Sequence, residues 1–248
     1  MNRIMIVTGG SRGIGAATAI LAAQRGYAVC VNYLHNRKAA EAIVRDIEQT
    51  GRHAIAVGAD VASERDVVRL FETVDKELGR VTALVNNAGI LEKQTRLDGI
   101  DAARLNRIFA TNVTGAFLCS REAVRRMSTR YGGEGGGIVN VSSRASQLGA
   151  PGEYVDYAAS KGAVDALTVG LSKEVAEEGI RVNAVRPGFI YTEMHASGGE
   201  PNRVDRVKDF APMKRGGQAG EVASAILWLL SDEASYTTGA FIEVSGGR

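Results

Sequence analysis

The stretch Ile4-Met-Ile-Val-Thr-Gly-Gly-Ser-Arg-Gly-Ile-Gly15 decides the fold of this 248-residue chain. A short apolar run typical of a buried strand leads into a glycine-rich turn, and a helical pattern follows. Glycines let the backbone approach a pyrophosphate, and a helix N-terminus favours its negative charge. We therefore expect Gly9, Gly13 and Gly15 to form a phosphate-binding turn, although their spacing differs from the usual G-x-G-x-x-G.

Apolar runs alternate with helical patterns along the rest of the chain. Further strands are expected at 28–33, 53–57, 83–86, 138–141, 181–186 and 241–244, with helices between them. This alternation predicts an α/β fold, a doubly wound (Rossmann) and mainly parallel sheet with helices on both faces. We expect one domain over residues 1–248. Residues 193–218 lack a strong pattern, and a long irregular segment is typical of a binding loop, so we expect a substrate lid at about 190–215.

Composition limits the class of protein. An apolar content of 45% and a charged content of 23% are typical of a soluble globular protein. The net charge of +2 gives no argument for a nucleic-acid or membrane partner. Cys30 and Cys119 form no disulfide framework, which favours a reducing compartment and hence the cytoplasm. His35, His53 and His195 lack metal-ligand spacing, so we expect surface histidines and no metal.

The end of the second strand indicates which cofactor binds. A dinucleotide site usually places an acid there for the ribose 2′-OH, but this chain has Asn32 and Tyr33. No carboxylate at these positions repels a 2′-phosphate, and Arg12 and Arg37 lie nearby in sequence. We therefore expect NADP(H) to be favoured over NAD(H). The alternative is that these are solvated loop residues.

Polar residues also follow the third and fourth strands. Asp60 could accept from an adenine amino group, or it could cap a turn. The sequence Asn86-Asn-Ala-Gly89 combines amides with small residues that suit a backbone close to a cofactor. Asn112 interrupts a helical pattern, where its amide competes for backbone hydrogen bonds. It predicts a local kink with a free carbonyl, unless it is a tolerated exposed residue.

A catalytic candidate follows the strand at 138–141. Tyr157 and Lys161 are four apart, which makes them neighbours on one face of a helix. The lysine charge is expected to lower the pKa of the phenol. Ser142 lies at the end of the preceding strand, so its hydroxyl could converge with both side chains on one substrate oxygen. In isolation, such a pair is more often a packed ring beside a solvated charge.

Together, these motifs and Pro187-Gly188 resemble the short-chain dehydrogenase/reductase family in the same order over essentially the whole chain, with 3-oxoacyl-carrier-protein reductases and glucose dehydrogenase-like members most similar. The resemblance implies hydride transfer between a nicotinamide and a carbonyl or secondary alcohol. It implies that Tyr157 is the general acid or base, Lys161 lowers its pKa and binds the nicotinamide ribose, and Ser142 polarises the substrate oxygen. It also implies that Asn112 holds a water for proton relay.

The same resemblance implies the contacts to NADP(H) and the assembly. Thr192 would contact the carboxamide, and the chain would be a homo-oligomer, a tetramer or dimer. The residues expected to contact the cofactor are Gly9, Ser11, Arg12, Gly13, Ile14, Gly15, Asn32, Tyr33, Arg37, Asp60, Val61, Asn87, Ala88, Gly89, Tyr157, Lys161, Pro187, Gly188, Ile190 and Thr192.

The sequence departs from the family pattern between Ser142 and Tyr157, which are farther apart than usual, so analogies about the substrate are in doubt. Tyr154 lies in this longer loop, but it lacks a lysine one turn on. Arg186 is also unusual, and could be structural.

Several alternatives stay open. The substrate could be a 3-oxoacyl thioester, a sugar or a small ketone. A basic group on the surface, Arg125, Arg126, Arg130 and Lys173, could receive an acidic carrier or be solvated. A catalytically silent NADP-binding sensor or scaffold would usually lack one of the four chemical residues. A sugar-nucleotide epimerase or dehydratase would need a larger C-terminal domain.

Overall fold

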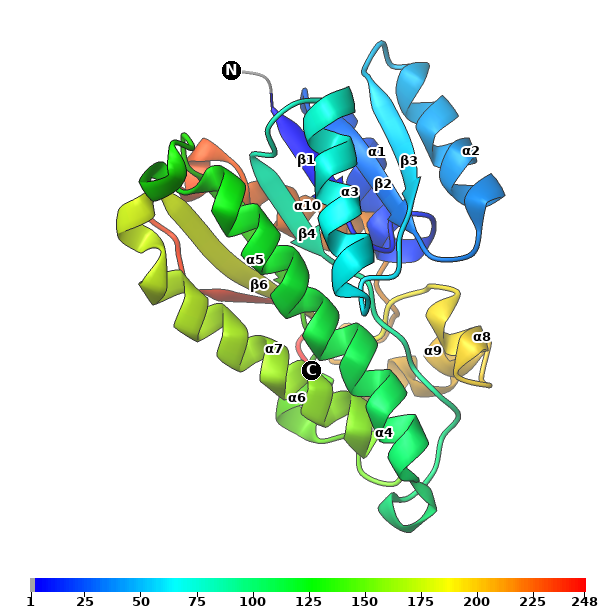
Figure 1. Ribbon diagram of the computed structural model, residues 1–248. Helices are drawn as coiled ribbons and strands as arrows, with labels where there is room; N and C mark the ends of the chain where they lie inside the picture. The colour runs from blue at the N-terminus through cyan, green and yellow to red at the C-terminus, as the bar shows by residue number, and fades with distance from the viewer. Residues whose placement is uncertain (1–2) are drawn as a thin grey trace.

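The computed structural model describes residues 3–248, and its centre is one parallel sheet (Figure 1). Seven strands run in the order β3-β2-β1-β4-β5-β6-β7, and every neighbouring pair is parallel. The order reverses on either side of β1, as in doubly wound folds. The strands are β1 Ile4–Val7, β2 Ala28–Tyr33, β3 Ala54–Gly58, β4 Ala83–Asn86, β5 Gly136–Val141, β6 Ile180–Pro187 and β7 Phe241–Val244. The expected α/β fold with a doubly wound sheet is confirmed.

Helices cover both faces of the sheet (Figure 1). They are α1 Gly13–Gln24, α2 Arg37–Glu48, α3 Glu64–Glu77, α4 Ala102–Phe109, α5 Gly115–Met127, α6 Ala145–Leu148, α7 Val155–Glu174, α8 Met194–Ser197, α9 Arg203–Val207 and α10 Ala219–Leu229. No helix within residues 3–248 is long and apolar enough to cross a membrane.

The alternation of side chains along each strand divides the core into two clusters. In β1, Met5 and Val7 pack with residues of α1, α2 and α10, whereas Ile4 and Ile6 pack with residues of α3 and α5. Both clusters consist of buried hydrophobic side chains, most of them aliphatic. Strands buried on both faces explain why the sequence shows continuous apolar runs instead of alternation.

Asn112 lies where the long helical pattern is interrupted. The π-helical turn Ala110–Thr114 separates α4 from α5, and Asn112 is buried inside it. A π-turn widens the helix locally and often marks a functional position. The expected local irregularity at Asn112 is therefore present as a π-turn, and the alternative of an exposed residue is wrong.

The segment expected to be a lid leaves the sheet after β6 and returns before α10. It carries two short helices, α8 and α9, which lie together beyond one edge of the sheet in Figure 1. Its two ends are joined, because Gly217 N donates to Phe189 O at 2.8 Å and Tyr191 N donates to Gly217 O at 3.0 Å. The segment between Tyr191 and Gly217 is therefore a long loop whose two ends are hydrogen-bonded to each other. Its role as a lid stays a prediction.

Candidate active site

The glycine turn after β1 has the shape that a pyrophosphate needs. Gly9 and Gly13 have φ values of +61° and +52°, in the left-handed region that glycine adopts without strain. A Cβ at Gly15 would lie 2.4 Å from the carbonyl oxygen of Gly9, so only glycine fits there. In the described chain no side chain caps the N-terminus of α1, and its first turn carries no acid. The N–H groups of that turn are therefore free to receive an anion, and these residues fit a dinucleotide.

Thr8 and Asn87 hold the turn against the end of β4. The Thr8 hydroxyl accepts from the backbone N–H groups of Asn87 and Ala88, at 2.9 and 3.0 Å. Asn87 Nδ2 donates to the carbonyl oxygens of Thr8 and Gly9 at 2.9 and 3.0 Å. Asn87 thus braces the turn, and its neighbour Ala88 approaches Gly9 closely. Thr8 was not among the expected site residues, although it begins the same motif.

Asn32 has a different role from the expected one. Its side chain is buried and fully engaged by backbone, accepting from Gly9 N at 3.2 Å and donating to Ala59 O at 3.0 Å. It therefore joins the ends of β1, β2 and β3 and has no free group for a ribose. Tyr33 packs its ring over Gly58, and Arg37 forms an exposed ion pair with Glu41 at 2.6 Å.

Asp60 and Val61, the expected cofactor contacts after β3, make contacts within the protein itself. Asp60 accepts from Ala62 N at 2.9 Å, which is the turn-capping alternative. Val61 is buried, and a Cβ at Gly115 of α5 would lie 2.7 Å from its side chain. Arg12 and Ser11 lie at the mouth of the glycine turn, where Arg12 is exposed.

Tyr157 and Lys161 project from the first turns of α7 into one pocket, as expected from their spacing. The pocket lies beyond the ends of β5 and β6 and is also lined by Ile14, Asn87, Ser142, Ser143, Pro187, Gly188, Ile190 and Thr192. Lys161 Nζ donates to Val141 O at 2.8 Å and lies 5.6 Å from the centre of the Tyr157 ring. Residues from strand ends, turns and a helix that are distant in sequence therefore meet beyond the carboxyl ends of the strands.

Burial dominates the electrostatics of the pair. It raises the pKa of Tyr157 to about 12, although a hydrogen bond with Ser143 opposes the rise. It lowers the pKa of Lys161 to about 8, with Asp165 acting in the opposite direction. The expected lowering of the tyrosine pKa is therefore wrong for the chain alone, because loss of hydration penalises the phenolate more than its surroundings stabilise it.

The two serines after β5 face different groups. Ser142 is buried, and its hydroxyl donates to the carbonyl oxygen of Lys161 at 3.4 Å, away from the phenol. The hydroxyl that hydrogen-bonds the Tyr157 side chain belongs to Ser143, which also accepts from Ala145 N at 3.1 Å. The geometry therefore moves the expected role of Ser142 to its neighbour, because successive side chains at a strand end point in opposite directions.

Asn112 and Gly89 lie behind Lys161. The amide of Asn112 accepts from Ile90 N at 2.8 Å and donates to Ile90 O at 3.1 Å, and it also donates to Ser160. A Cβ at Gly89 would lie 3.5 Å from both Asn112 Oδ1 and Lys161 Nζ. The predicted neighbourhood of Asn112 and Lys161 is present, and the side-chain amide also fixes the loop after β4.

The buried pair Arg104–Asp156 holds the start of α7. Arg104 Nε donates to Asp156 at 2.6 Å, and Arg104 Nη1 donates to Lys93 O at 2.7 Å. The other oxygen of Asp156 accepts from Tyr157 N at 2.9 Å. Burial pushes the pKa of Asp156 upward, but these hydrogen bonds outweigh it and lower the pKa. The carboxylate therefore links α4, the loop after β4 and the backbone of Tyr157.

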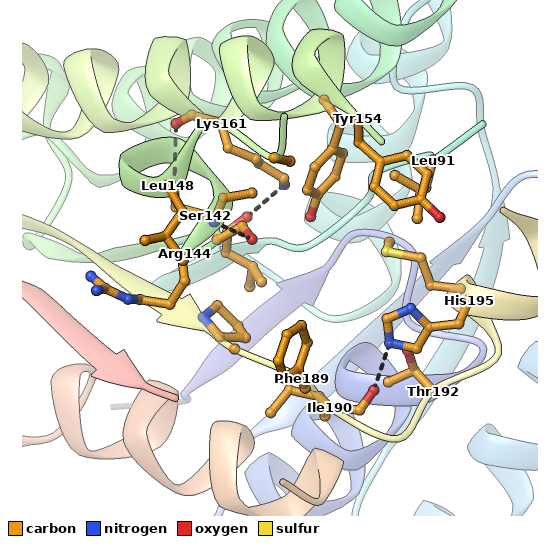
Figure 2. Close-up of a pocket in the computed structure, with 18 of the residues that line it drawn as sticks. Leu91, Ser142, Arg144, Leu148, Tyr154, Lys161, Phe189, Ile190, Thr192 and His195 are labelled. Atoms are coloured by element: carbon orange, nitrogen blue, oxygen red, sulfur yellow. Dashed lines mark hydrogen bonds between the residues drawn. The ribbon is translucent and has the colours of Figure 1, made fainter. Parts of the chain in front are cut away.

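The far wall of the pocket consists of residues that the sequence did not indicate. Leu91 and His195 lie at the end opposite Ser142 and Lys161 (Figure 2). His195 Nε2 bonds Ile190 O at 3.0 Å, and burial lowers the histidine pKa, so the ring is neutral. The expectation of a surface histidine is wrong for His195, because the segment after β6 folds back over the pocket.

Arginines on the pocket and at the protein surface are mostly paired. Arg203 of α9 stacks 5.0 Å from the Tyr154 ring and pairs with Glu153, so the longer loop before α7 meets the lid segment. Arg186 pairs with Asp165 at 3.0 Å, which is the structural alternative. Two members of the expected basic group on the surface, Arg125 and Arg126 of α5, both pair with Glu122, so the group is partly neutralised.

Three comparisons with known proteins agree with this geometry. Residues 9–248 match a family model described as enoyl-(acyl carrier protein) reductase. The chain belongs to the short-chain dehydrogenase/reductase family. It is 63% identical to YgfF, an uncharacterized oxidoreductase of Escherichia coli, over 99% of both chains. It is 39% identical to a 3-oxoacyl-[acyl-carrier-protein] reductase of Synechocystis, over 99% of this chain and 96% of the relative.

A solved short-chain dehydrogenase of Burkholderia cenocepacia, in complex with NADP, has the same fold. Its TM-score is 0.91 at 32% identity, with 99% of this chain and 97% of that chain covered. These findings confirm the resemblance that the motifs indicated. Short-chain dehydrogenases/reductases are oxidoreductases, so the pocket is the candidate active site of such an enzyme.

Proposed function

We propose that this protein transfers a hydride between NADP(H) and a carbonyl or secondary alcohol substrate, with Tyr157 as the general acid or base. The observation that carries the proposal is the convergence of the Tyr157 phenol, the Ser143 hydroxyl and the Lys161 ammonium on one pocket beside the glycine turn. A silent sensor would have no need for this set of groups.

The side chains supply position and proton transfer. NADP(H), when bound, supplies or accepts the hydride. In the reductive direction Tyr157 donates its proton to the carbonyl oxygen, and the Ser143 hydroxyl holds that oxygen by a hydrogen bond. Lys161, oriented by Val141 O, provides positive charge near the phenolate that remains and can hold the ribose. Asn112 stands next to Lys161, in position for a water that returns the proton.

The preference for NADP(H) is part of the proposal. The end of β2 carries no carboxylate. Arg12 is exposed and, unlike the equally exposed Arg37, forms no ion pair within the described chain. The turn before α1 and the residues around Asn87, Thr192 and Gly188 suit the phosphates and the nicotinamide. The NADP complex of the Burkholderia relative supports the same choice.

We propose that the chain works as a homo-oligomer in the cytoplasm. Leu105, Phe109 and Phe117 are large apolar side chains exposed on α4 and α5, and exposed apolar surface can mark an interface between subunits. Cys30 and Cys119 are buried free thiols, and burial raises the pKa of both, which suits a reducing compartment.

The test is the oxidation of NADPH, and of NADH beside it, with acetoacetyl thioester, small ketones and keto sugars. Wild type is expected to turn over at least one carbonyl, faster with NADPH. Tyr157→Phe is expected to lose activity by a factor of about 10² to 10⁴, the usual contribution of a general acid. NADPH binding by the variant, measured by fluorescence, is expected to persist. Unchanged turnover in Tyr157→Phe would reject the assignment, and faster turnover with NADH would reject the cofactor preference.

A further inference from the structure

The pocket around Tyr157 carries an excess of positive charge. In the part of the chain that the structure describes, its lining includes four cationic side chains, those of Arg144, Lys161, Arg203 and Arg248, and one acidic side chain, that of Glu153. The whole chain has a net charge of only +2, so the excess is local. A concave site with walls of low dielectric constant concentrates such a field on the molecule that enters it.

Two of the arginines are already neutralised by the protein. Arg144 donates to Glu243 at 2.6 Å, and its side chain extends away from the pocket centre (Figure 2). Arg203 pairs with Glu153 and, at 3.2 Å, with Glu200. The charge of each of these two guanidinium groups is thus already balanced by at least one carboxylate.

Arg248 differs from both. Its guanidinium lies 4.1 Å from the centre of the Phe189 ring, and Phe189 itself lines the pocket. No carboxylate in residues 3–248 lies within ion-pair distance of it. The side chain is half-buried, and burial together with Arg203 lowers its pKa, while the charge of Glu153 acts in the opposite direction. An arginine nevertheless stays charged throughout the working range. The pocket therefore contains an oriented, partly dehydrated guanidinium that forms no ion pair with an acidic side chain of residues 3–248.

We propose that Arg248 binds an oxoanion on the substrate, so that the substrate is a carbonyl compound or secondary alcohol that also carries a carboxylate or phosphate. This rests on the proposed function, since it assigns the substrate class of the same pocket. The planar fork of a guanidinium matches the geometry of both anions. Stacking on Phe189 restrains the side chain in advance, which reduces the entropy lost on binding.

The experiment compares charged substrates with neutral partners of the same carbon skeleton. The carboxylate arm is a series of 3-, 4-, 5- and 6-oxo acids and their methyl esters. The phosphate arm is dihydroxyacetone phosphate with dihydroxyacetone. Each is assayed by NADPH oxidation with wild type, Arg248→Gln and Arg248→Lys. Arg52→Gln is the matched control, because Arg52 is exposed and does not line the pocket.

We expect wild type to prefer at least one anion over its neutral partner. Arg248→Gln should lower kcat/KM for that anion by about 10- to 100-fold, the range for a lost charged hydrogen bond, chiefly through KM. Its kcat/KM for the neutral partner should stay within about twofold. Arg248→Lys should retain part of the preference, because lysine supplies a point charge without the fork. Arg52→Gln should behave as wild type.

Two results would overturn the proposal. The first is that the neutral partner reacts as well as the anion in every pair. The second is that Arg248→Gln lowers kcat/KM equally for both members of a pair. Either result leaves the reductase function intact, because carbonyls are still reduced. If wild type reduces no carbonyl at all, the proposed function itself fails and the assignment of Arg248 fails with it.

Discussion

At the scale of single residues, the two adjacent serines after β5 should behave differently. Ser143 hydrogen-bonds the phenol and opposes the rise that burial causes in the pKa of Tyr157, whereas Ser142 donates to a backbone carbonyl. Oxidation of an alcohol needs the ionised phenol, so its rate rises with pH through that pKa. Ser143→Ala removes the lowering contribution and should shift this rise to higher pH as well as reduce turnover.

The measurement is the pH profile of alcohol oxidation for wild type, Ser143→Ala and Ser142→Ala. The Ser142→Ala profile should coincide with that of wild type. A shift in Ser142→Ala with none in Ser143→Ala would return the role to Ser142. The sequence could place a hydroxyl near Tyr157, but it could not choose between two neighbours, because their directions depend on where β5 ends.

At the scale of elements, two ion pairs of α4 should differ in their contribution to the free energy of unfolding. The buried pair Arg104–Asp156 should contribute more than the exposed pair Arg107–Glu92. The side chains of Arg104 and Asp156 are 8% and 0% exposed, whereas those of Arg107 and Glu92 are 56% and 28% exposed. Arg104→Met leaves a buried carboxylate without its partner, which costs about 3–5 kcal/mol. Arg107→Met should cost less than about 1 kcal/mol, because water screens that pair.

Urea denaturation of the two variants, with the double variant Arg104→Met/Asp156→Asn, checks this expectation. The double variant should be more stable than Arg104→Met, since it leaves no unpaired charge in the core. Equal stabilities of Arg104→Met and Arg107→Met would show that burial does not govern the strength of these pairs.

The boundaries of elements were largely predictable, but the contacts between them were not. Apolar runs bounded by glycines placed β1, β2, β4 and β7 at their observed residues, and Asn112 marked the interruption between α4 and α5. The hydrogen bonds by which the Asn32 side chain joins three strand ends could not be inferred, because its partners Gly9 and Ala59 are 23 and 27 positions away. The ion pair between Arg203 and Glu153 could not be inferred either, because these residues are 50 positions apart.

At the scale of the whole molecule, the exposed apolar side chains of α4 and α5 should be covered by a second copy. Phe117 of α5 is 48% exposed, and Phe109 at the end of α4 is 37% exposed. Phe117→Asp places a charge in the proposed interface and should yield a smaller species, measured by sedimentation velocity. Leu34→Asp, also at an exposed apolar residue but after β2, should leave the assembly unchanged. A monomeric wild type would reject the interface.

The central position of β1 also determines when the protein can fold during synthesis. β1 pairs with β4, and the glycine turn is closed by Asn87, which is 78 positions beyond Gly9. A ribosome therefore has to release the first third of the chain before the nucleotide-binding turn can take its shape. Until then β1 has a free edge and an apolar surface, so the nascent chain is a natural client for chaperones that hold extended segments.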